Sequence, residues 1–405
     1  MRALGPWVLC AACACVDPGS TDGPSGTITP PHVGTVSVHD PVEPLVPTGT
    51  PWEWDLPLGF PAPVVPVDDP MTAEKVELGR HLFYDTRLSG NGTQACASCH
   101  EQARAFTDGR ALPLGSTGVD GVRNAMGLSN VAYHSTLTWA SPVLVQLEQQ
   151  APVPMFGETP VELGITGHEE DVLALLAEDP DYGELFAAAY PRMDPDERVD
   201  WDPIVGALAS FVRALVSFDT PYDRFAYGGD SSAMTDSQKR GMQLFFGEKL
   251  ECHHCHGSPM FSNSFVTVNS AEPERPFFND GLYNIDGEGA YPPDNTGLYA
   301  FTGQPWDMGK FRPPSLRNLA YTAPYMHDGS VATLDKVLDM YANGGRLLES
   351  GPYAGDGSLN PYKSAFLIGF ELTAQERRDV LAFLLEGLRD DTLVDDPRFS
   401  DPFTP

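Results

Sequence analysis

Four cysteines, each pair followed by a histidine, are the residues whose types and spacing most clearly imply chemistry. Residues 96–100 and 252–256 both read C-x-x-C-H, and they use every cysteine after residue 15. Two thiols one helical turn apart reach the two vinyl groups of one porphyrin, and the adjacent imidazole then points at the iron. The pattern therefore predicts two covalently bound haem c groups, with attachment residues Cys96, Cys99 and His100 for one and Cys252, Cys255 and His256 for the other.

Other uses of paired cysteines fit this pattern less well. A disulfide framework does not require a histidine after each pair, and a thioredoxin-like redox pair belongs to a βαβ pattern that is absent. A zinc site built from both pairs, with His253 and His254 as further ligands, is the remaining alternative. The pairs lie far apart in the chain and each has its own histidine, which favours haem. Two haems in one chain point to electron transfer or redox chemistry.

The segments before the two motifs resemble each other. Residues 79–84 read GRHLFY and residues 241–246 read GMQLFF, so both follow G-x-x-L-F-aromatic. Each follows a polar helix-start signal, at 71–74 and at 235–238. A repeated order of helix, loop and C-x-x-C-H predicts two tandem haem domains of similar fold.

The remaining pattern predicts a mainly α fold with long ordered loops. We expect further helices over 169–177, 203–217, 333–342 and 373–388, while strand signals are weak and short. Leu208, Phe211, Val212 and Leu215 fall on one apolar helical face. With 39 Gly and 38 Pro in 405 residues, many turns are expected.

The chain begins with a segment typical of export. Residues 1–16 carry one positive charge and then an apolar run, as in a signal peptide. The small residues around Cys13 also resemble a lipoprotein cleavage site, so a lipid anchor is the alternative to a plainly cleaved signal. Residues 17–50 read as a disordered linker. We expect an N-terminal haem domain over 51–220, a C-terminal haem domain over 221–395 and a tail over 396–405.

The charge of the chain excludes some classes of function. Fifty-six acidic residues against 25 Lys and Arg give a net charge of -31. A nucleic-acid binder needs an excess of Lys and Arg, and so does a protein that docks on an anionic membrane. The acidic surface instead favours a basic donor or substrate protein, or serves only solubility.

Several motifs in a consistent order resemble the di-haem cytochrome c peroxidases, including their MauG branch. The likeness runs from about residue 69 to residue 388. Besides the two C-x-x-C-H motifs, it includes the following segments: LFYDTRLS at 82–89, FTDG at 106–109, RN at 123–124, TW at 138–139, RG at 240–241, LRN at 316–318 and TAPYMHDG at 322–329.

The resemblance implies roles for the two halves. The N-terminal haem is expected to react with hydrogen peroxide, and the C-terminal haem to receive electrons from a donor. Trp139 matches a tryptophan between the haems, although a core tryptophan is the plainer interpretation. A calcium ion is also implied, with the Asn124 side chain and the backbone carbonyls of Thr322 and Pro324 as ligands; oxygen ligands suit this cation.

The first haem is expected to have an open iron position. Many family members carry a closing histidine after the first motif, near residues 115–118, and this chain has none there. His134 and His168 are the alternatives as ligands. For proton transfer, Gln150 matches the family's lead-in, and Glu162 matches its acidic motif, with Glu158 as the alternative by spacing. A solvated loop carboxylate is the plain interpretation of either glutamate.

The sixth ligand of the second haem is expected about fourteen residues after His327, which is Tyr341. Peroxidases of the family have Met at this position and the MauG branch has Tyr. A phenolate favours ferric and higher-valent iron. Met340, Met326 and Met308 are rival ligands, and a half-buried helix residue is the plain interpretation of Tyr341.

Together these features predict a periplasmic or exported oxidoreductase. It reduces peroxide with electrons from a small cytochrome c or a cupredoxin, or it oxidises a partner protein or organic substrate as MauG does. A di-haem electron carrier without catalysis is the further alternative, disfavoured by the missing histidine. Relatives are monomers or homodimers.

Overall fold

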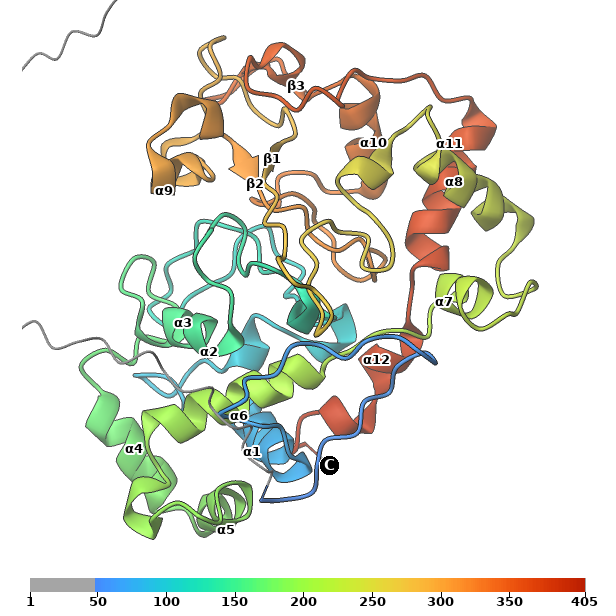
Figure 1. Cartoon of the computed structure of the whole chain (residues 1–405). Helices are drawn as coiled ribbons and strands as arrows, with labels where there is room; N and C mark the ends of the chain where they lie inside the picture. The colour runs from blue at the N-terminus through green and yellow to red at the C-terminus, as the bar shows by residue number, and fades with distance from the viewer. Residues whose placement is uncertain (1–47, 405) are drawn as a thin grey trace, which may run out of the picture. The chain divides into compact units, whose positions relative to one another are not determined.

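The computed structural model of the protein describes residues 48–404 (Figure 1). The export segment expected at 1–16 and most of the linker expected at 17–50 lie outside the described residues. Residues 48–404 belong to one compact unit by their internal contacts. Within the described range, no helix is both long enough and apolar enough to cross a membrane.

The protein is mainly helical, as expected, with two small two-stranded antiparallel sheets. The α-helices are α1 (Ala73–Tyr84), α2 (Leu147–Gln150), α3 (Pro152–Phe156), α4 (Glu169–Ala177), α5 (Pro180–Ala189), α6 (Trp201–Ala214), α7 (Pro221–Ala226), α8 (Asp236–Phe246), α9 (Tyr299–Thr302), α10 (Leu334–Ala342), α11 (Ala374–Ala382) and α12 (Asp391–Asp395). The sheets are β1 (Phe278–Asn279) with β2 (Lys310–Phe311) and β3 (Leu347–Leu348) with β4 (Gly355–Asp356).

The helix starts proposed from the sequence are confirmed. Thr72 caps α1 by accepting a bond from the Lys75 amide, and Thr235 caps α8 in a reciprocal pair with Gln238. The helix expected over 169–177 is α4 with the same bounds. The one expected over 373–388 is α11, continued by a π-helical turn at Phe383–Gly387. The helix expected over 203–217 begins two residues earlier and ends at Ala214.

The repeated glycines mark two equivalent helix crossings. α1 packs on α6, and α8 packs on α11 (Figure 1). A Cβ atom built on Gly79 would lie 2.0 Å from the Ala207 carbonyl oxygen, and one on Gly241 would lie 1.9 Å from that of Asp379. Only a residue without a side chain lets the backbones come this close. The sequence repeat is therefore also a repeat of packing.

Replacing Gly241 with Ala is expected to destabilise the protein by at least about 1–3 kcal/mol, the usual cost of overpacking a core. The new methyl group meets rigid backbone, which outweighs the gain in helix propensity of about 1 kcal/mol. Gly183→Ala in α5 is the matched control, because its Cβ atom meets nothing within 4 Å. Thermal unfolding should show a lower midpoint for Gly241→Ala and an equal or higher one for Gly183→Ala.

The buried apolar residues form two large clusters. The first gathers side chains of α1, α4, α5 and α6, and it also takes in Leu393 and Phe399 from the end of the chain. The second gathers side chains of α8, α10 and α11 and takes in Trp139 and Ala140. Each cluster thus includes side chains from the other half of the sequence. The division into haem domains at about residue 220, where Thr220 caps α7, stays a prediction.

Long segments between the helices hold the motif residues. From Tyr84 to Leu147, and again from Phe246 to Leu334, the chain forms loops with only short helical turns and strands. The first C-x-x-C-H lies at the turn Cys96–Ser98, and the second at the turn Cys252–His254. The helices therefore serve as the frame on which these loops are packed.

Candidate functional site

The first motif holds its histidine in one orientation. The Nδ1 atom of His100 is 2.8 Å from the backbone carbonyl oxygen of Phe106, to which it can donate a hydrogen bond. This contact orients the ring and leaves Nε2 free as a metal ligand. Burial lowers the pKa of His100, so its imidazole is neutral and suited to coordination. The thiols of Cys96 and Cys99 are unpaired, and burial raises the pKa of each to about 12.

Glu162 and Gln150, the residues expected to handle protons, have more buried surroundings than Glu158, the alternative glutamate. Burial raises the pKa of Glu162, and its charge in turn raises the pKa of both Cys96 and Cys99, so the carboxylate lies near the first motif. The Oε1 atom of Gln150 is buried without a hydrogen-bond partner in the described part of the chain. Glu158, by contrast, is exposed. Glu162 is thus near the first motif and Glu158 is solvated, and the role of Glu162 stays a prediction.

The segment that lacks a histidine packs directly on the Glu162 backbone. The Ser116 amide donates to the Glu162 carbonyl oxygen at 2.8 Å, and a Cβ on Gly115 would lie 2.0 Å from the Val161 carbonyl oxygen. The alternative histidines lie elsewhere: His134 is buried with Nδ1 3.0 Å from the Ser264 carbonyl oxygen, and His168 is exposed at the start of α4.

The second motif opens into a cavity of about 250 Å³ with mainly apolar walls. His256 lies on the cavity wall with Cys252 and Cys255. Its Nδ1 atom is 3.0 Å from the carbonyl oxygen of Phe261 and 3.1 Å from that of Pro314, which again leaves Nε2 free. Burial lowers the pKa of His256 to about 4. The same tethering by a carbonyl oxygen five or six residues after the histidine occurs at both motifs.

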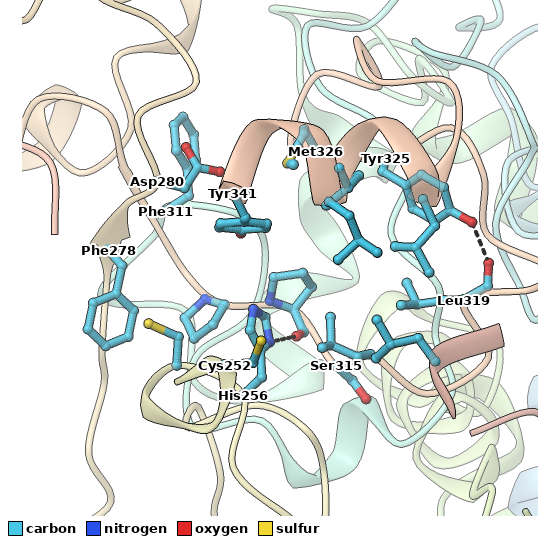
Figure 2. A pocket seen from close by; sticks show the side chains of 18 of the residues that line it. Cys252, His256, Phe278, Asp280, Phe311, Ser315, Leu319, Tyr325, Met326 and Tyr341 are labelled. Carbon is cyan, nitrogen blue, oxygen red and sulfur yellow. Dashed lines mark hydrogen bonds between the residues drawn. The ribbon is translucent and has the colours of Figure 1, made fainter. Parts of the chain in front are cut away.

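Tyr341, in the last turn of α10, stands over His256 on the opposite wall of this cavity (Figure 2). Burial raises the pKa of its phenol well above the usual value, and the charges of Asp280, Cys255 and Cys252 raise it further. These couplings place the phenol close to the two thiols that would carry the haem.

The methionines proposed as rivals lie in different places. Met326 lines the cavity, but further along its wall than Tyr341 (Figure 2). Met340, the residue directly before Tyr341 in α10, is buried in the second core. The backbone carbonyl of Met308 accepts a hydrogen bond from the Asn279 side chain. Neither Met340 nor Met308 is among the residues that line this cavity.

Two further residues of this cavity were not singled out from the sequence. Arg312, which follows β2, is fully buried, and its Nη1 atom has no partner among the residues described. Burial lowers its pKa to about 9. Asp280, which follows β1, is half-buried beside Tyr341, and loss of solvation raises its pKa to about 6. No local signal marks either residue, because pairing of β1 with β2 is what brings them to the cavity.

Trp139 is linked to the surroundings of both motifs by a short chain of contacts. Its Nε1 atom donates to the Asn124 carbonyl oxygen at 2.8 Å, and its ring lines the cavity of His256. The adjacent carbonyl oxygen, that of Ala125, accepts a hydrogen bond from the Thr107 hydroxyl. Thr107 directly follows Phe106, whose carbonyl oxygen orients His100. One segment, 124–125, therefore joins the surroundings of both histidines.

The residues expected to bind calcium meet along the same cavity. Asn124, Thr322 and Pro324 all line it. The Asn124 side-chain nitrogen donates to the Arg110 carbonyl oxygen at 2.7 Å, which leaves its side-chain oxygen as the free acceptor. A calcium site at these residues stays a prediction.

The surroundings fit haem better than the zinc alternative. In residues 48–404, no group of three or more His, Cys, Asp and Glu side chains is arranged to hold a metal ion. Cys96 packs on the first core and Cys252 on the second, so the two pairs are not one site. The apolar cavity at His256, and the buried Arg312 whose Nη1 atom has no partner in residues 48–404, suit a large apolar ring that carries anionic groups.

Comparison with known proteins agrees with this chemistry. The model of the di-haem cytochrome c peroxidase family matches residues 73–232. The chain is 37% identical to cytochrome-c peroxidase IdrP1 of Pseudomonas sp. (strain SCT), over 85% of this chain and 89% of that protein. It is 32% identical to the methylamine utilization protein MauG of Methylorubrum extorquens, over 79% of each.

Solved structures extend the comparison. The crystal structure of a MauG-like protein associated with microbial copper homeostasis is 53% identical, with a TM-score of 0.84, covering 87% of this chain and 99% of that one. The diheme peroxidase BthA from Burkholderia thailandensis shares the fold at 20% identity and a TM-score of 0.60, covering 79% and 87%. The chain is thus a peroxidase-type oxidoreductase, and it belongs to the di-haem cytochrome c peroxidase family.

Proposed function

We propose that the protein uses hydrogen peroxide to oxidise a partner protein or another organic substrate, as in the MauG branch of the family. The first motif would hold the haem at which peroxide is reduced, and the second motif would hold a haem that can share the oxidising equivalents. The placement of Tyr341 opposite His256 carries this proposal. A phenolate ligand donates more electron density than a thioether and so stabilises the more oxidised iron.

The two haems supply the iron chemistry that cleaves the O–O bond and stores the oxidising equivalents. His100 and His256 would hold the irons through Nε2, because a backbone carbonyl occupies Nδ1 in each. The four thiols would form the thioether links. Arg312 would neutralise an anionic propionate group of the second haem, because a buried guanidinium without a counter-ion is costly.

Glu162 would move the proton of peroxide from one oxygen to the other. Its raised pKa makes the carboxylate a stronger base than an exposed glutamate, while it can still return the proton to the departing oxygen. Gln150, whose side-chain carbonyl oxygen has no partner within residues 48–404, would accept a hydrogen bond from peroxide or water. Trp139 would connect the two halves, since its indole is fixed by the Asn124 carbonyl.

We also propose a calcium ion held by Asn124, Thr322 and Pro324. Removing it with EGTA is expected to lower the thermal midpoint and to loosen the segment that holds Trp139, because Asn124 contributes to both. Calcium should restore the midpoint and magnesium should not, since magnesium prefers a smaller octahedral site. An unchanged midpoint in EGTA, together with no calcium in metal analysis, would remove the proposal.

Peroxidase activity with a small donor protein is the second candidate, favoured by the relatives named cytochrome-c peroxidase. The net charge of -31 suits a basic cytochrome c or cupredoxin. The likeness to the MauG-like protein associated with microbial copper homeostasis supports a role in copper homeostasis. Loss of the protein should then change the copper tolerance of its host, and unchanged tolerance would argue against that role.

The cellular location and the oligomeric state of the protein are part of the proposal. Covalent haem attachment by C-x-x-C-H takes place outside the cytoplasm, which supports an exported, periplasmic protein with or without a lipid anchor. A monomer or a homodimer is expected from relatives. Mass analysis of the mature protein would distinguish a lipidated cysteine from a plainly cleaved signal.

The decisive experiment uses the purified holoprotein with hydrogen peroxide, with and without reduced cytochrome c. We expect one high-spin ferric haem at rest and a rapid spectral change on adding peroxide. Slow turnover of reduced cytochrome c would favour the MauG-like role, and fast turnover the peroxidase role. Two low-spin haems that do not react with peroxide would leave only a simple electron carrier.

A further inference from the structure

A row of aromatic rings leads from the cavity of His256 to the protein surface. Phe311 and His327 line the cavity and are stacked, with ring centroids 3.6 Å apart. Tyr291 contacts both of them, with centroid distances of 6.3 Å. Tyr283 lies 5.5 Å from Tyr291 in an edge-to-face pair. These separations are those of directly interacting aromatic rings.

The row ends at an exposed phenol. Tyr353 lies 5.9 Å from Tyr283, again edge to face. Tyr291 and Tyr283 are 4% and 5% exposed, whereas Tyr353 is 41% exposed. Three phenols, two buried and one accessible, thus follow one another outward from the cavity wall.

The middle phenol has a base within reach of its proton. The Tyr283 hydroxyl donates to Oδ2 of Asp328 at 2.6 Å. A phenol that loses an electron becomes strongly acidic, so a nearby carboxylate that accepts the proton makes the oxidation easier. The Arg346 guanidinium lies 5.9 Å from the Tyr283 ring, and it binds Ser330 rather than Asp328. Oδ1 of Asp328 accepts from the Ser330 amide at 3.0 Å, which leaves Oδ2 as the acceptor for the Tyr283 proton.

We propose that Tyr353 is a surface oxidation site, at which a bulky phenol or an aromatic side chain of a protein gives electrons to the buried centre. This inference rests on the proposed function, which supplies the oxidant. A protein substrate cannot enter a cavity of about 250 Å³. The three successive phenols of the row let such a substrate react without entering it.

The electrons balance as two single steps for each peroxide. An electron leaves Tyr283 inward through Tyr291 while its phenolic proton passes to Asp328. Tyr353 then reduces Tyr283, which takes its proton back, and Tyr353 releases its own proton to water. Finally the substrate phenol or indole restores Tyr353 by giving one electron and one proton. Two such events deliver the two electrons and two protons that convert one H₂O₂ to two H₂O.

The test is radical trapping in the holoprotein. Hydrogen peroxide is added without a reductant, in the presence of a nitroso spin trap, and the adducts are located by peptide mass spectrometry. We expect an adduct at Tyr353 that disappears in Tyr353→Phe and falls severalfold in Tyr283→Phe, because the latter lacks the linking phenol. The spectral reaction of the haems with peroxide is recorded in the same samples.

Trp306 provides the internal control. It is 58% exposed, more than Tyr353, and belongs to no close aromatic pair within residues 48–404. Adducts at Trp306 as strong as those at Tyr353, or adducts at Tyr353 that Tyr283→Phe does not lower, would overturn the inference. If the haems react with peroxide and Tyr353 stays unlabelled, only this inference fails. If the haems do not react at all, the proposed function fails as well.

Discussion

Glu162→Gln is expected to slow the reaction of the holoprotein with hydrogen peroxide by about 10²–10⁴-fold, the usual contribution of a positioned acid–base group. Glutamine keeps the shape of the side chain but cannot accept a proton. The carboxylate lies near Cys96 and Cys99, which would carry the haem. Stopped-flow absorption at increasing peroxide concentration measures the second-order rate constant directly.

The wild-type rate should also depend on pH in a defined direction. Burial raises the pKa of Glu162 above its ordinary value. Since the carboxylate is the form that accepts the proton, the rate should fall as the pH drops through this raised pKa. Glu162→Gln should show no such decrease. A pH profile shared by both proteins would assign the titration to another group.

The thermal stability of Glu162→Gln shows whether the variant has only lost a proton acceptor or whether its fold is damaged. Because the pKa of Glu162 is higher in the folded than in the unfolded protein, its protonated side chain contributes fully to stability when the pH is below the unfolded pKa. This contribution is lost as the pH rises through the folded pKa. At neutral pH the buried charge therefore opposes folding, and Glu162→Gln should unfold at the same or a higher temperature. Glu158→Gln is the matched control: it changes an exposed carboxyl and should react normally. A slow Glu158→Gln and a normal Glu162→Gln would exchange their roles.

Tyr341→Met is expected to raise the reduction potential of the second haem by an amount on the order of hundreds of millivolts, within the roughly 0.8 V that axial ligands span. A thioether stabilises ferrous iron, whereas a phenolate stabilises ferric iron. The absorption and electron paramagnetic resonance spectra of this haem should change at the same time. A potentiometric titration followed by absorption checks the prediction.

Tyr325→Phe is the control for Tyr341→Met. Tyr325 lines the same cavity, but its hydroxyl donates to the Leu319 carbonyl oxygen and so is occupied. Its loss should leave the potential and the spectra of the second haem nearly unchanged. Unaltered spectra in Tyr341→Met would show that Tyr341 is not a ligand and would turn attention to Met326, which also lines the cavity.

Some of the candidate site was readable from residue spacing and some was not. The choice between Glu162 and Glu158 stayed open in the sequence because a loop of uncertain length separates them from Gln150. In the structure, residues 115–116 pack on the backbone of 161–162. The Glu162 carboxylate lies near Cys96 and Cys99, whereas Glu158 is exposed. Arg312 and Asp280 carried no signal, because an arginine or aspartate next to a short strand is ordinary until its surroundings are known.

By itself, the sequence determined the two attachment motifs, the helix starts at Thr72 and Thr235 and the repeated glycines. Each depends on groups a few residues apart, or on one residue type that alone permits a close crossing. The tertiary structure alone decided which side chains share the cavity of His256, how Trp139 is fixed and which phenols form the row to Tyr353. Those contacts join segments far apart in the chain, and burial and close packing arise only when the whole fold brings them together.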